Sequence, residues 1–247
     1  MAGVGLIKAE KVYSNGFRAV EELDLEIIKG EFMVLSGPSG CGKSTILRMI
    51  SGLEEATRGE IRIGDKVVNN LNPKEREISL VSQNHELYPH MTIYENIAFP
   101  LKMKGIPKDE IERRVKEFSE KLGIEGILSE KPKDVSGEER QLAAIGKALV
   151  RGPKVVLFDE PLSNLDVRVR GRVGTRLKVL HQELRDRGQE VTMIYATQDR
   201  FEAVKMGDRI CLLDCGRVVQ LDTPSNLYNY PLNGSAEEFA DFPLPVL

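Results

Sequence analysis

The stretch that decides the fold is Gly37-Pro38-Ser39-Gly40-Cys41-Gly42-Lys43-Ser44-Thr45. It matches the pattern G-x-x-x-x-G-K-[ST] of a phosphate-binding loop, and a short buried strand expected over Phe32–Ser36 leads into it. A helix is predicted to follow from Lys43 to about Ser51 and to end near Gly52. In this context the glycines let backbone N–H groups turn toward a phosphate, and the helix adds its positive N-terminal end. The sequence therefore predicts a nucleotide-binding loop.

The side chains of this loop predict a triphosphate bound together with a metal ion. Lys43 supplies a positive charge for the β- and γ-phosphates, and the Ser44 hydroxyl is a ligand for Mg²⁺. The remaining nucleotide contacts are expected from Ser39, Gly40, Cys41, Gly42 and Thr45. We interpret Cys41 as a small filler rather than a redox group. A chance match in a glycine-rich loop is the alternative, and the strand and helix predicted on either side disfavour it.

A second apolar strand, expected over Val155–Phe158, ends in two carboxylates, Asp159 and Glu160. A strand beside the phosphate loop can place Asp159 near the Mg²⁺ ion. Glu160 is then positioned to polarise a water molecule that attacks the phosphate. An acidic pair on the surface is the alternative interpretation. With the phosphate loop already in the chain, the pair favours hydrolysis of a nucleoside triphosphate.

The other apolar segments alternate with helical patterns. Buried strands separated by helices indicate an α/β fold with a mostly parallel sheet, and the stretch from about Tyr88 to Leu149 is interpreted as an inserted helical subdomain. The tail from Asp222 to Leu247 is predicted to form a capping helix and then a loosely ordered end. Further strands are predicted at Val4–Val12, Leu23–Ile28, Glu60–Ile63, Ile78–Ser82, Val191–Ala196, Arg209–Leu213 and Arg217–Leu221, and helices at Lys108–Leu122, after Ser136, at Leu165–Arg187 and at Asp199–Met206.

Composition excludes several classes of protein. The 247 residues carry 35 Lys and Arg against 38 Asp and Glu, and this net charge of −3 argues against a basic nucleic-acid binder. No apolar run approaches the ~20 residues of a membrane span, and the N-terminus lacks the apolar core of a signal peptide. Three cysteines, Cys41, Cys211 and Cys215, make neither a disulfide framework nor a four-ligand zinc site. A reducing cytoplasm is the expected compartment.

The histidines and a run of arginines could suggest a metal site and a nucleic-acid site, but we expect structural or surface roles for both groups. The histidines His85, His90 and His181 are scattered without the spacing of metal ligands, so we expect them in the core or on the surface. The arginines at positions 168, 170, 172 and 176 alternate with Val and Gly on one predicted helix. We interpret them as a solvated face and dimer surface rather than a nucleic-acid site.

Taken in order, these residues resemble the nucleotide-binding subunit of ATP-binding-cassette (ABC) transporters, and within it the sugar-importer ATPases typified by the maltose importer. The resemblance runs from about Val4 to Tyr230. Beyond the two phosphate motifs it rests on four segments: Leu87–Thr92, the run Asp159-Glu160-Pro161-Leu162-Ser163-Asn164-Leu165-Asp166, Gly216–Val218 and Thr223–Tyr228. The resemblance implies a P-loop NTPase core with a mostly parallel sheet, an N-terminal antiparallel β region and an inserted α-helical subdomain.

The resemblance also implies a domain division and a setting. One nucleotide-binding domain is expected over 1–235, with its helical subdomain at about 88–150, followed by a tail at 236–247. A further β-rich regulatory domain, usual in sugar-importer ATPases, is expected to be absent. The implied cofactors are ATP and Mg²⁺. The implied partners are a second copy of the chain, membrane permease subunits and, indirectly, a solute-binding protein, with no nucleic acid, at the cytoplasmic face of the cell membrane.

Further site residues follow from the resemblance alone. Tyr13 occupies the place where the family stacks an aromatic ring on adenine. Gln83 matches the glutamine that links Mg²⁺ to the helical subdomain and senses the γ-phosphate. In the implied head-to-tail dimer, which encloses two ATP molecules, Ser136, Gly137 and Asp166 face the nucleotide of the partner. Closure of that dimer moves the permease, and hydrolysis resets it.

Two departures from the family pattern fall on the chemistry. The signature Leu-Ser-Gly-Gly-Gln is replaced by Val135-Ser136-Gly137-Glu138-Glu139, which brings negative charge toward a triphosphate. At ~4 Å such a like-charge pair costs about 1 kcal/mol in water and about 4 kcal/mol at an effective dielectric constant near 20. Arg140 and Mg²⁺ would offset part of this cost, and rotation of either side chain into solvent would spare the site, so we expect weakened closure of the dimer but not loss of binding. Gln198 replaces a histidine that contacts the γ-phosphate. The lost charge-assisted contact predicts a cost of ~2–4 kcal/mol, or a rate ~10² to 10³ lower.

These departures leave three functions open. The first is an ATP-hydrolysing importer subunit for a sugar or related solute. The second is a cassette that binds ATP but hydrolyses it very slowly because of Glu138, Glu139 and Gln198. The third is a soluble ABC ATPase outside transport, which the single cassette and the acidic balance disfavour.

Overall fold

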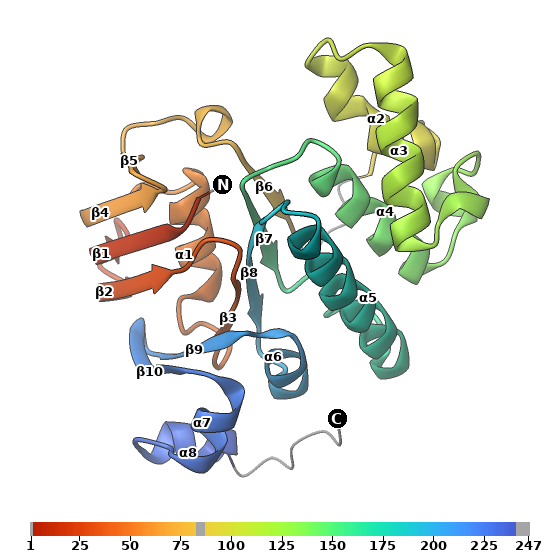
Figure 1. The fold of residues 1–247 in the computed structure, drawn as a ribbon. Helices are drawn as coiled ribbons and strands as arrows, with labels where there is room; N and C mark the ends of the chain where they lie inside the picture. Colours follow the sequence, from red (N-terminus) through yellow and green to blue (C-terminus); the bar gives the residue numbers. More distant parts are fainter. Residues whose placement is uncertain (1, 83–86, 241–247) are drawn as a thin grey trace.

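Two sheets and the helices between and around them make up the computed structural model, which describes residues 2–82 and 87–240 (Figure 1). The N-terminal sheet is antiparallel, in the order β2-β1-β4-β5. Its strands are β1 (Val4–Val12), β2 (Arg18–Ile27), β4 (Arg58–Ile63) and β5 (Lys66–Val67). Buried and exposed residues alternate along β2, as expected of a sheet with one face on the core.

The second sheet is the core of the molecule and has the order β10-β9-β3-β8-β7-β6. All neighbouring strands are parallel except β10, which is antiparallel to β9. Strands β3 and β8 are buried along their whole length, because helices cover both faces of the sheet. The strands are β3 (Phe32–Ser36), β6 (Ile78–Val81), β7 (Val155–Asp159), β8 (Thr192–Thr197), β9 (Arg209–Asp214) and β10 (Arg217–Asp222).

The side chains of β3 divide the interior into two apolar clusters. Phe32 and Val34 point to one face, toward α5 (Val167–Asp186) and α6 (Arg200–Met206). Met33 and Leu35 point to the other, toward α1 (Lys43–Ser51), which lies between the two sheets (Figure 1). This alternation is the two-residue period of a strand, and it places the start of α1 at the carboxyl end of β3.

Three helices stand apart as the helical subdomain: α2 (Ile93–Met103), α3 (Lys108–Leu122) and α4 (Gly137–Leu149) (Figure 1). The subdomain is held by an apolar stripe at i, i+4, i+7 and i+11 of α3 that packs in the first apolar cluster, namely Ile111, Val115, Phe118 and Leu122. Short 3₁₀ turns at Pro73–Glu75, Glu125–Ile127 and Pro132–Asp134 complete the connections. No helix in the described part of the chain is long and apolar enough to cross a membrane.

The predicted α/β architecture is confirmed, and the differences are local. Strand β2 begins at Arg18, five residues before the predicted start at Leu23, because it pairs with β1 through the whole hairpin. The C-terminal region forms two helices, α7 (Pro224–Asn229) and α8 (Gly234–Ala240), rather than one. Buried Ala236 and Phe239 attach α8 to the first apolar cluster, so the described part of the tail is packed on the core rather than loosely ordered.

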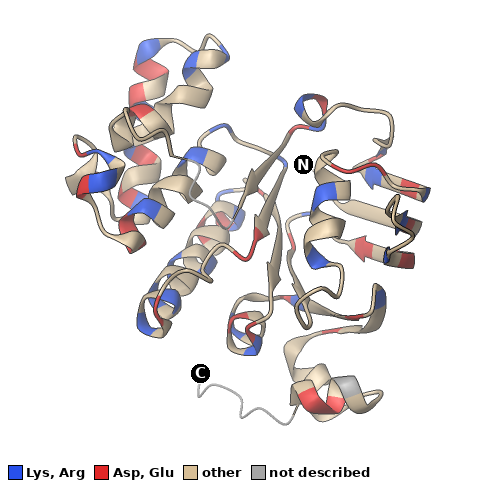
Figure 2. Ribbon diagram, turned by 180° about the vertical axis from the view of Figure 1, so that it is seen from behind, with Lys and Arg blue, Asp and Glu red and all other residues tan. Residues whose placement is uncertain are grey.

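The arginines of α5 have partners that their sequence pattern does not reveal. Arg170 pairs with Asp199 at 3.2 Å, Arg172 pairs with Glu138 at 2.5 Å, and Arg176 donates to the carbonyl of Lys121 at 3.1 Å. Figure 2 shows basic residues distributed along this helix rather than gathered in one field. Arg172 and Arg176 are exposed, which agrees with the predicted solvated face, and the predicted dimer surface stays a prediction.

Glycine does not interrupt α5, although two glycines in a helix cost about 1 kcal/mol each relative to alanine. A Cβ atom at Gly174 would lie 3.4 Å from Met206 Sδ and 3.9 Å from Leu162 Cδ1. The missing side chain therefore lets α5 lie close to α6, which offsets part of the cost.

Buried His181 gives the fold a pH dependence. Its ring meets Phe32 edge-on at 5.3 Å, and burial is the main cause that lowers its pKa, while Asp208 raises it and Lys178 and Arg185 lower it. The unfolded chain therefore binds a proton that the folded chain does not, and stability is lost as pH falls below about 6.5.

We expect the melting temperature to fall between about pH 7 and about pH 5.5, and a His181→Leu variant to show a shallower fall. Melting curves recorded by circular dichroism at several pH values give the change of melting temperature with pH for both chains. His90→Gln is the control because His90 is exposed. Equal slopes for His181→Leu and the parent chain would refute this role.

Candidate functional site

The phosphate loop encloses the side chain of Lys43, which begins α1. The ammonium donates to the carbonyls of Gly37 at 2.8 Å and Pro38 at 2.9 Å, and only 4% of the residue is exposed. Gly42 has φ 107°, and a Cβ atom there would lie 2.5 Å from the carbonyl oxygen of Ala19. Glycine is required at this position by conformation and by space, and the resulting turn directs Lys43 into the loop.

Ser44 and Asp159 meet across two elements. The Ser44 hydroxyl, at the start of α1, donates to Asp159 Oδ1, at the end of β7, over 2.7 Å. A hydroxyl and a carboxylate are oxygen ligands of the kind that Mg²⁺ takes, with phosphate oxygens and water completing its shell. Within the described residues no group of three or more His, Cys, Asp or Glu could hold a metal. The donor set therefore fits a metal that binds together with a phosphate.

Glu160 follows Asp159 in a strained conformation. Its φ of 45° lies in the left-handed region, where a side chain other than glycine is uncommon. The conformation is fixed because Glu160 N–H donates to the carbonyl of Ala196 at 3.0 Å and its own carbonyl accepts from Ser163 Oγ at 2.9 Å. The carboxylate lies 3.8 Å from Lys43 Nζ. Strain of this kind gathers at functional sites, and here it turns the carboxylate toward the phosphate loop.

Tyr13 closes one end of the loop from the β1–β2 hairpin. Its hydroxyl lies 3.4 Å from Thr45 Oγ1, and its ring is nearly parallel to that of Phe17, with centroids 6.5 Å apart. Phe17 was not singled out in the sequence, although its place across the hairpin from Tyr13 is a signal that could have found it. A flat aromatic surface therefore lies next to the phosphate loop.

Gln198 directly follows β8 and is exposed. Behind it, buried Glu202 accepts from Tyr195 Oη at 2.8 Å and Thr197 Oγ1 at 2.9 Å, and burial raises the pKa of its carboxyl. Thr197 Oγ1 also accepts from the N–H of Asp199 at 3.0 Å. These bonds fix the backbone on both sides of Gln198. No local pattern in the sequence indicates this support.

The two carboxylates of the signature segment, Val135–Glu139, are bound by other groups of the same chain. Ser136 caps α4, and Glu139 Oε2 accepts from both the backbone N–H of Ser136 at 2.8 Å and its hydroxyl at 2.7 Å. These hydrogen bonds hold the pKa of Glu139 below its usual range. Glu138 pairs with Arg172. Both carboxylates therefore have a partner in the chain, whereas the sequence predicted negative charge directed at a nucleotide.

The predicted residues fall into two groups. Lys43, Ser44, Thr45, Asp159, Glu160 and Tyr13 are joined by the contacts above. Ser136 and Gly137 begin α4, and Asp166 caps α5 by accepting from the N–H of Val169 at 3.0 Å. Among the described residues, neither Ser136 nor Asp166 makes a hydrogen bond to the phosphate loop. Gln83 lies outside the described residues.

The three cysteines are free, with Cys41 and Cys211 buried and Cys215 exposed. Burial raises the pKa of the Cys41 thiol and raises that of Cys211 to about 12. Both are therefore protonated at neutral pH, as inert core thiols are.

A phosphate loop, an acidic strand end beside it and a helical subdomain define the protein as an ATP-binding cassette. Residues 20–163 match the ABC transporter family, and the chain belongs to that family. It is 48% identical to the trehalose/maltose import ATP-binding protein MalK of Thermococcus litoralis, over 98% of this chain and 65% of that protein. It is 49% identical to the osmoprotective compounds uptake protein GgtA of Synechocystis, over 94% of this chain and 62% of that protein.

Solved structures agree on the fold. The structure of cbiO1 from Clostridium perfringens, part of an ABC transporter complex, matches with a TM-score of 0.84 and 25% identity over 92% of this chain and 90% of that one. The dimeric post-hydrolysis structure of the cassette MJ0796, bound to ADP and phosphate, matches with a TM-score of 0.77 and 32% identity over 90% of this chain and 98% of that one. The chain spans just under two thirds of the length of MalK and GgtA, 65% and 62%.

Proposed function

We propose that the chain is the Mg²⁺-dependent ATPase of an importer for a sugar or a related solute, such as a glycerol phosphate or an osmolyte. The observation that carries this proposal is the meeting of Lys43, the Ser44–Asp159 pair and Glu160 at one loop. Relatives support the solute class. Besides MalK and GgtA, an sn-glycerol-3-phosphate import protein, UgpC of Cupriavidus metallidurans, is 47% identical over 98% of this chain and 65% of that protein.

Each residue at the loop takes one role. Lys43 and the backbone N–H groups of 39–45 bind the phosphates, with the α1 N-terminus adding positive potential. Ser44 and Asp159 would hold Mg²⁺, which would neutralise charge on the phosphates. Glu160 accepts a proton from the water that attacks the γ-phosphate, and ADP leaves on the opposite side. Tyr13 stacks on the adenine, and Gln83 is proposed to bridge the metal and the helical subdomain.

Two copies would complete the site. In the proposed head-to-tail homodimer, the α4 N-terminus with Ser136 and Gly137 faces the γ-phosphate bound by the partner, and Asp166 contacts the partner's phosphate loop. Gln198 donates its amide to the γ-phosphate. The dimeric structure of MJ0796 supports a dimer for this fold. Without the second copy, the described contacts leave the signature residues away from any phosphate loop.

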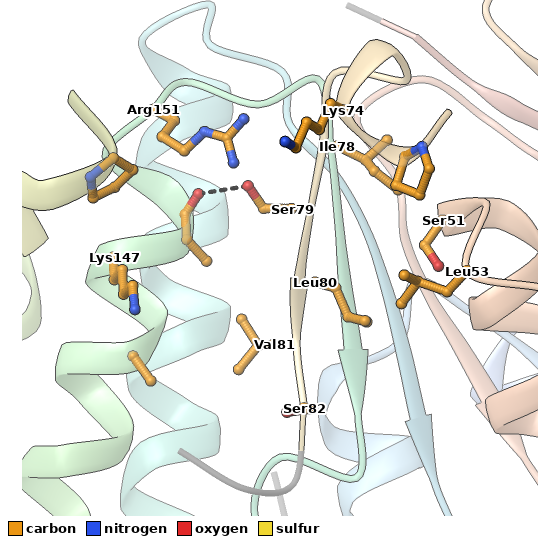
Figure 3. A pocket seen from close by; sticks show the side chains of 14 residues that line it. Ser51, Leu53, Lys74, Ile78, Ser79, Leu80, Val81, Ser82, Lys147 and Arg151 are labelled. Carbon is orange, nitrogen blue, oxygen red and sulfur yellow. Dashed lines mark hydrogen bonds between the residues drawn. The ribbon is translucent and has the colours of Figure 1, made fainter. Parts of the chain in front are cut away.

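A groove between the two subdomains supports a membrane permease as the partner. It encloses about 440 Å³ between the end of α1, strand β6 and helix α4 (Figure 3). Leu53 and Leu80 give it an apolar wall, and Lys74 and Arg151 reach toward the same end in Figure 3. This chemistry fits a short amphipathic helix with an acidic residue. The assembly would act at the cytoplasmic face of the cell membrane, with a solute-binding protein as an indirect partner.

We expect Leu53→Glu to abolish copurification with co-expressed permease subunits, because it places a charge on the apolar wall. ATP turnover by the isolated chain should stay within about twofold, since Leu53 follows the C-terminal end of α1 and the phosphate loop precedes its N-terminal end. The control is Val67→Glu on β5, since Leu53 is 55% exposed and Val67 is 50% exposed. Unchanged copurification of Leu53→Glu would reject the groove as the docking site.

A cassette that binds ATP but hydrolyses it slowly is the second candidate. Two observations favour slow hydrolysis. The Ser136 hydroxyl already donates to Glu139, and Gln198 after β8 offers the γ-phosphate only an uncharged donor. Turnover of the isolated chain separates the two candidates.

A further inference from the structure

The ion pair between Glu138 and Arg172 joins two helices 34 residues apart in the sequence. Arg172 Nη2 donates to Glu138 Oε2 at 2.5 Å, and Nε donates to Oε1 at 3.3 Å, so the guanidinium binds both carboxylate oxygens. The Glu138 side chain is 27% exposed and that of Arg172 is 60% exposed. A two-point contact of this kind fixes the direction of a carboxylate as well as its charge.

The position of Glu138 makes that direction matter. It is the second residue of α4, directly after Gly137, and the signature pattern of the family has glycine there. In the proposed dimer this end of the helix faces the triphosphate of the partner. A carboxylate aimed at the triphosphate repels it, whereas a carboxylate turned toward α5 and bound by a cation does not.

Glu139 is held in place without an ion pair to another helix. Its carboxylate is already turned back on Ser136, where it closes the capping box of α4. Glu138 makes no such bond to the start of its helix within the described residues. Arg172 is therefore the group that determines where the second carboxylate of the signature points.

We propose that Arg172 is a positioning residue of the signature segment, which holds Glu138 away from the nucleotide of the partner copy and neutralises its charge. The proposal rests on the proposed dimer. Arg172 then compensates within the chain for the glutamate at a glycine position. A purely structural tie between the helical subdomain and α5 is the alternative. Because Glu138 makes half of that tie, the alternative predicts that Glu138→Gly weakens the dimer as much as Arg172→Gln does, whereas the proposal predicts that Glu138→Gly does not weaken it.

The test measures the dissociation constant of the ATP-bound dimer by analytical ultracentrifugation in Mg²⁺-ATP. A Glu160→Gln background prevents consumption of the nucleotide. We expect Arg172→Gln to weaken the dimer about tenfold and Arg172→Lys, which keeps the charge, to weaken it less. In a Glu138→Gly background, Arg172→Gln should change the constant by less than about twofold, because no carboxylate remains to be positioned.

The matched control is Arg113→Gln on α3. Arg113 makes a two-point ion pair with Glu110, at 2.7 and 2.8 Å, and its side chain is 61% exposed, close to the 60% of Arg172. Removing it should leave the dimer unchanged. A tenfold loss for Arg113→Gln would mean that any surface ion pair has this effect, and the proposal would be rejected.

The remaining outcomes are decisive. Equal weakening by Arg172→Gln with and without Glu138 overturns the proposal. A Glu138→Gly dimer as weak as the Arg172→Gln dimer also overturns it, because the ion pair then has a structural role. No weakening in either background also overturns it. If the Glu138→Gly chain dimerises with ATP and the Glu138 chain does not, Arg172 fails to compensate, and the proposed dimer survives alone. If no variant dimerises although each binds ATP as a monomer, the proposed dimer itself is wrong.

Discussion

Replacing Glu160 by glutamine is expected to lower ATP turnover by about 10² to 10³ while ATP binding changes less than about threefold. The amide keeps the shape of the side chain and the backbone bonds that hold Glu160 at φ 45°. It cannot accept a proton from water at neutral pH. Phosphate release measured at saturating Mg²⁺-ATP, with binding of a fluorescent ATP analogue, separates the two effects.

A matched control tests whether the site of the carboxylate matters. Glu183→Gln removes a half-buried carboxylate from α5, away from the phosphate loop, and should leave turnover within about twofold. If Glu160→Gln retains more than about a third of the parent rate, Glu160 is not the group that activates water.

Replacing Gln198 by histidine is expected to raise turnover by about 10² to 10³. The backbone on both sides of position 198 is fixed by hydrogen bonds among Thr197, Asp199 and Glu202. An imidazole would therefore replace the exposed amide without a change of backbone conformation. A protonated imidazole gives the γ-phosphate a charge-assisted contact that the amide lacks. The new rate should therefore decline as the pH rises past the imidazole pKa, near 6.5 if it is unperturbed.

The triple variant Gln198→His, Glu138→Gly, Glu139→Gln extends this test. Glutamine at 139 can still close the capping box with Ser136, so the helix start is kept while a charge is removed. We expect the triple variant to exceed Gln198→His in turnover. If neither variant exceeds the parent chain, position 198 does not limit the reaction, and the prediction based on the resemblance is wrong.

The sequence predicted the nucleotide loop well because its determinants are local. The strand Phe32–Ser36, the glycines and the helix from Lys43 all lie within about twenty consecutive residues, and each has a distinct pattern. Asp159 was predicted near Mg²⁺ because an apolar strand ends there, and a strand beside the phosphate loop can place its last residue near the metal. The contact with Ser44 at 2.7 Å agrees with that reasoning.

The direction of the signature carboxylates was only partly accessible from sequence. Ser136 and Glu139 form the S-x-x-E pattern of a capping box, so the inward turn of Glu139 could have been predicted. Glu138 and Arg172 meet only because α4 packs against α5, which depends on the tertiary fold. For the same reason no local pattern revealed the network around buried Glu202. The domain limits at 235 and at 88–150 stay predictions.

The most direct test of the account is Mg²⁺-ATP turnover by the isolated chain over a range of protein concentrations, with Lys43→Ala as the background. Lys43 lies within the phosphate loop, 2.8 Å from the carbonyl of Gly37, so its loss should remove turnover. We predict a specific rate that rises with protein concentration above the Lys43→Ala background, as expected of a site completed by a second copy. A rate equal to that background at every concentration would contradict the account.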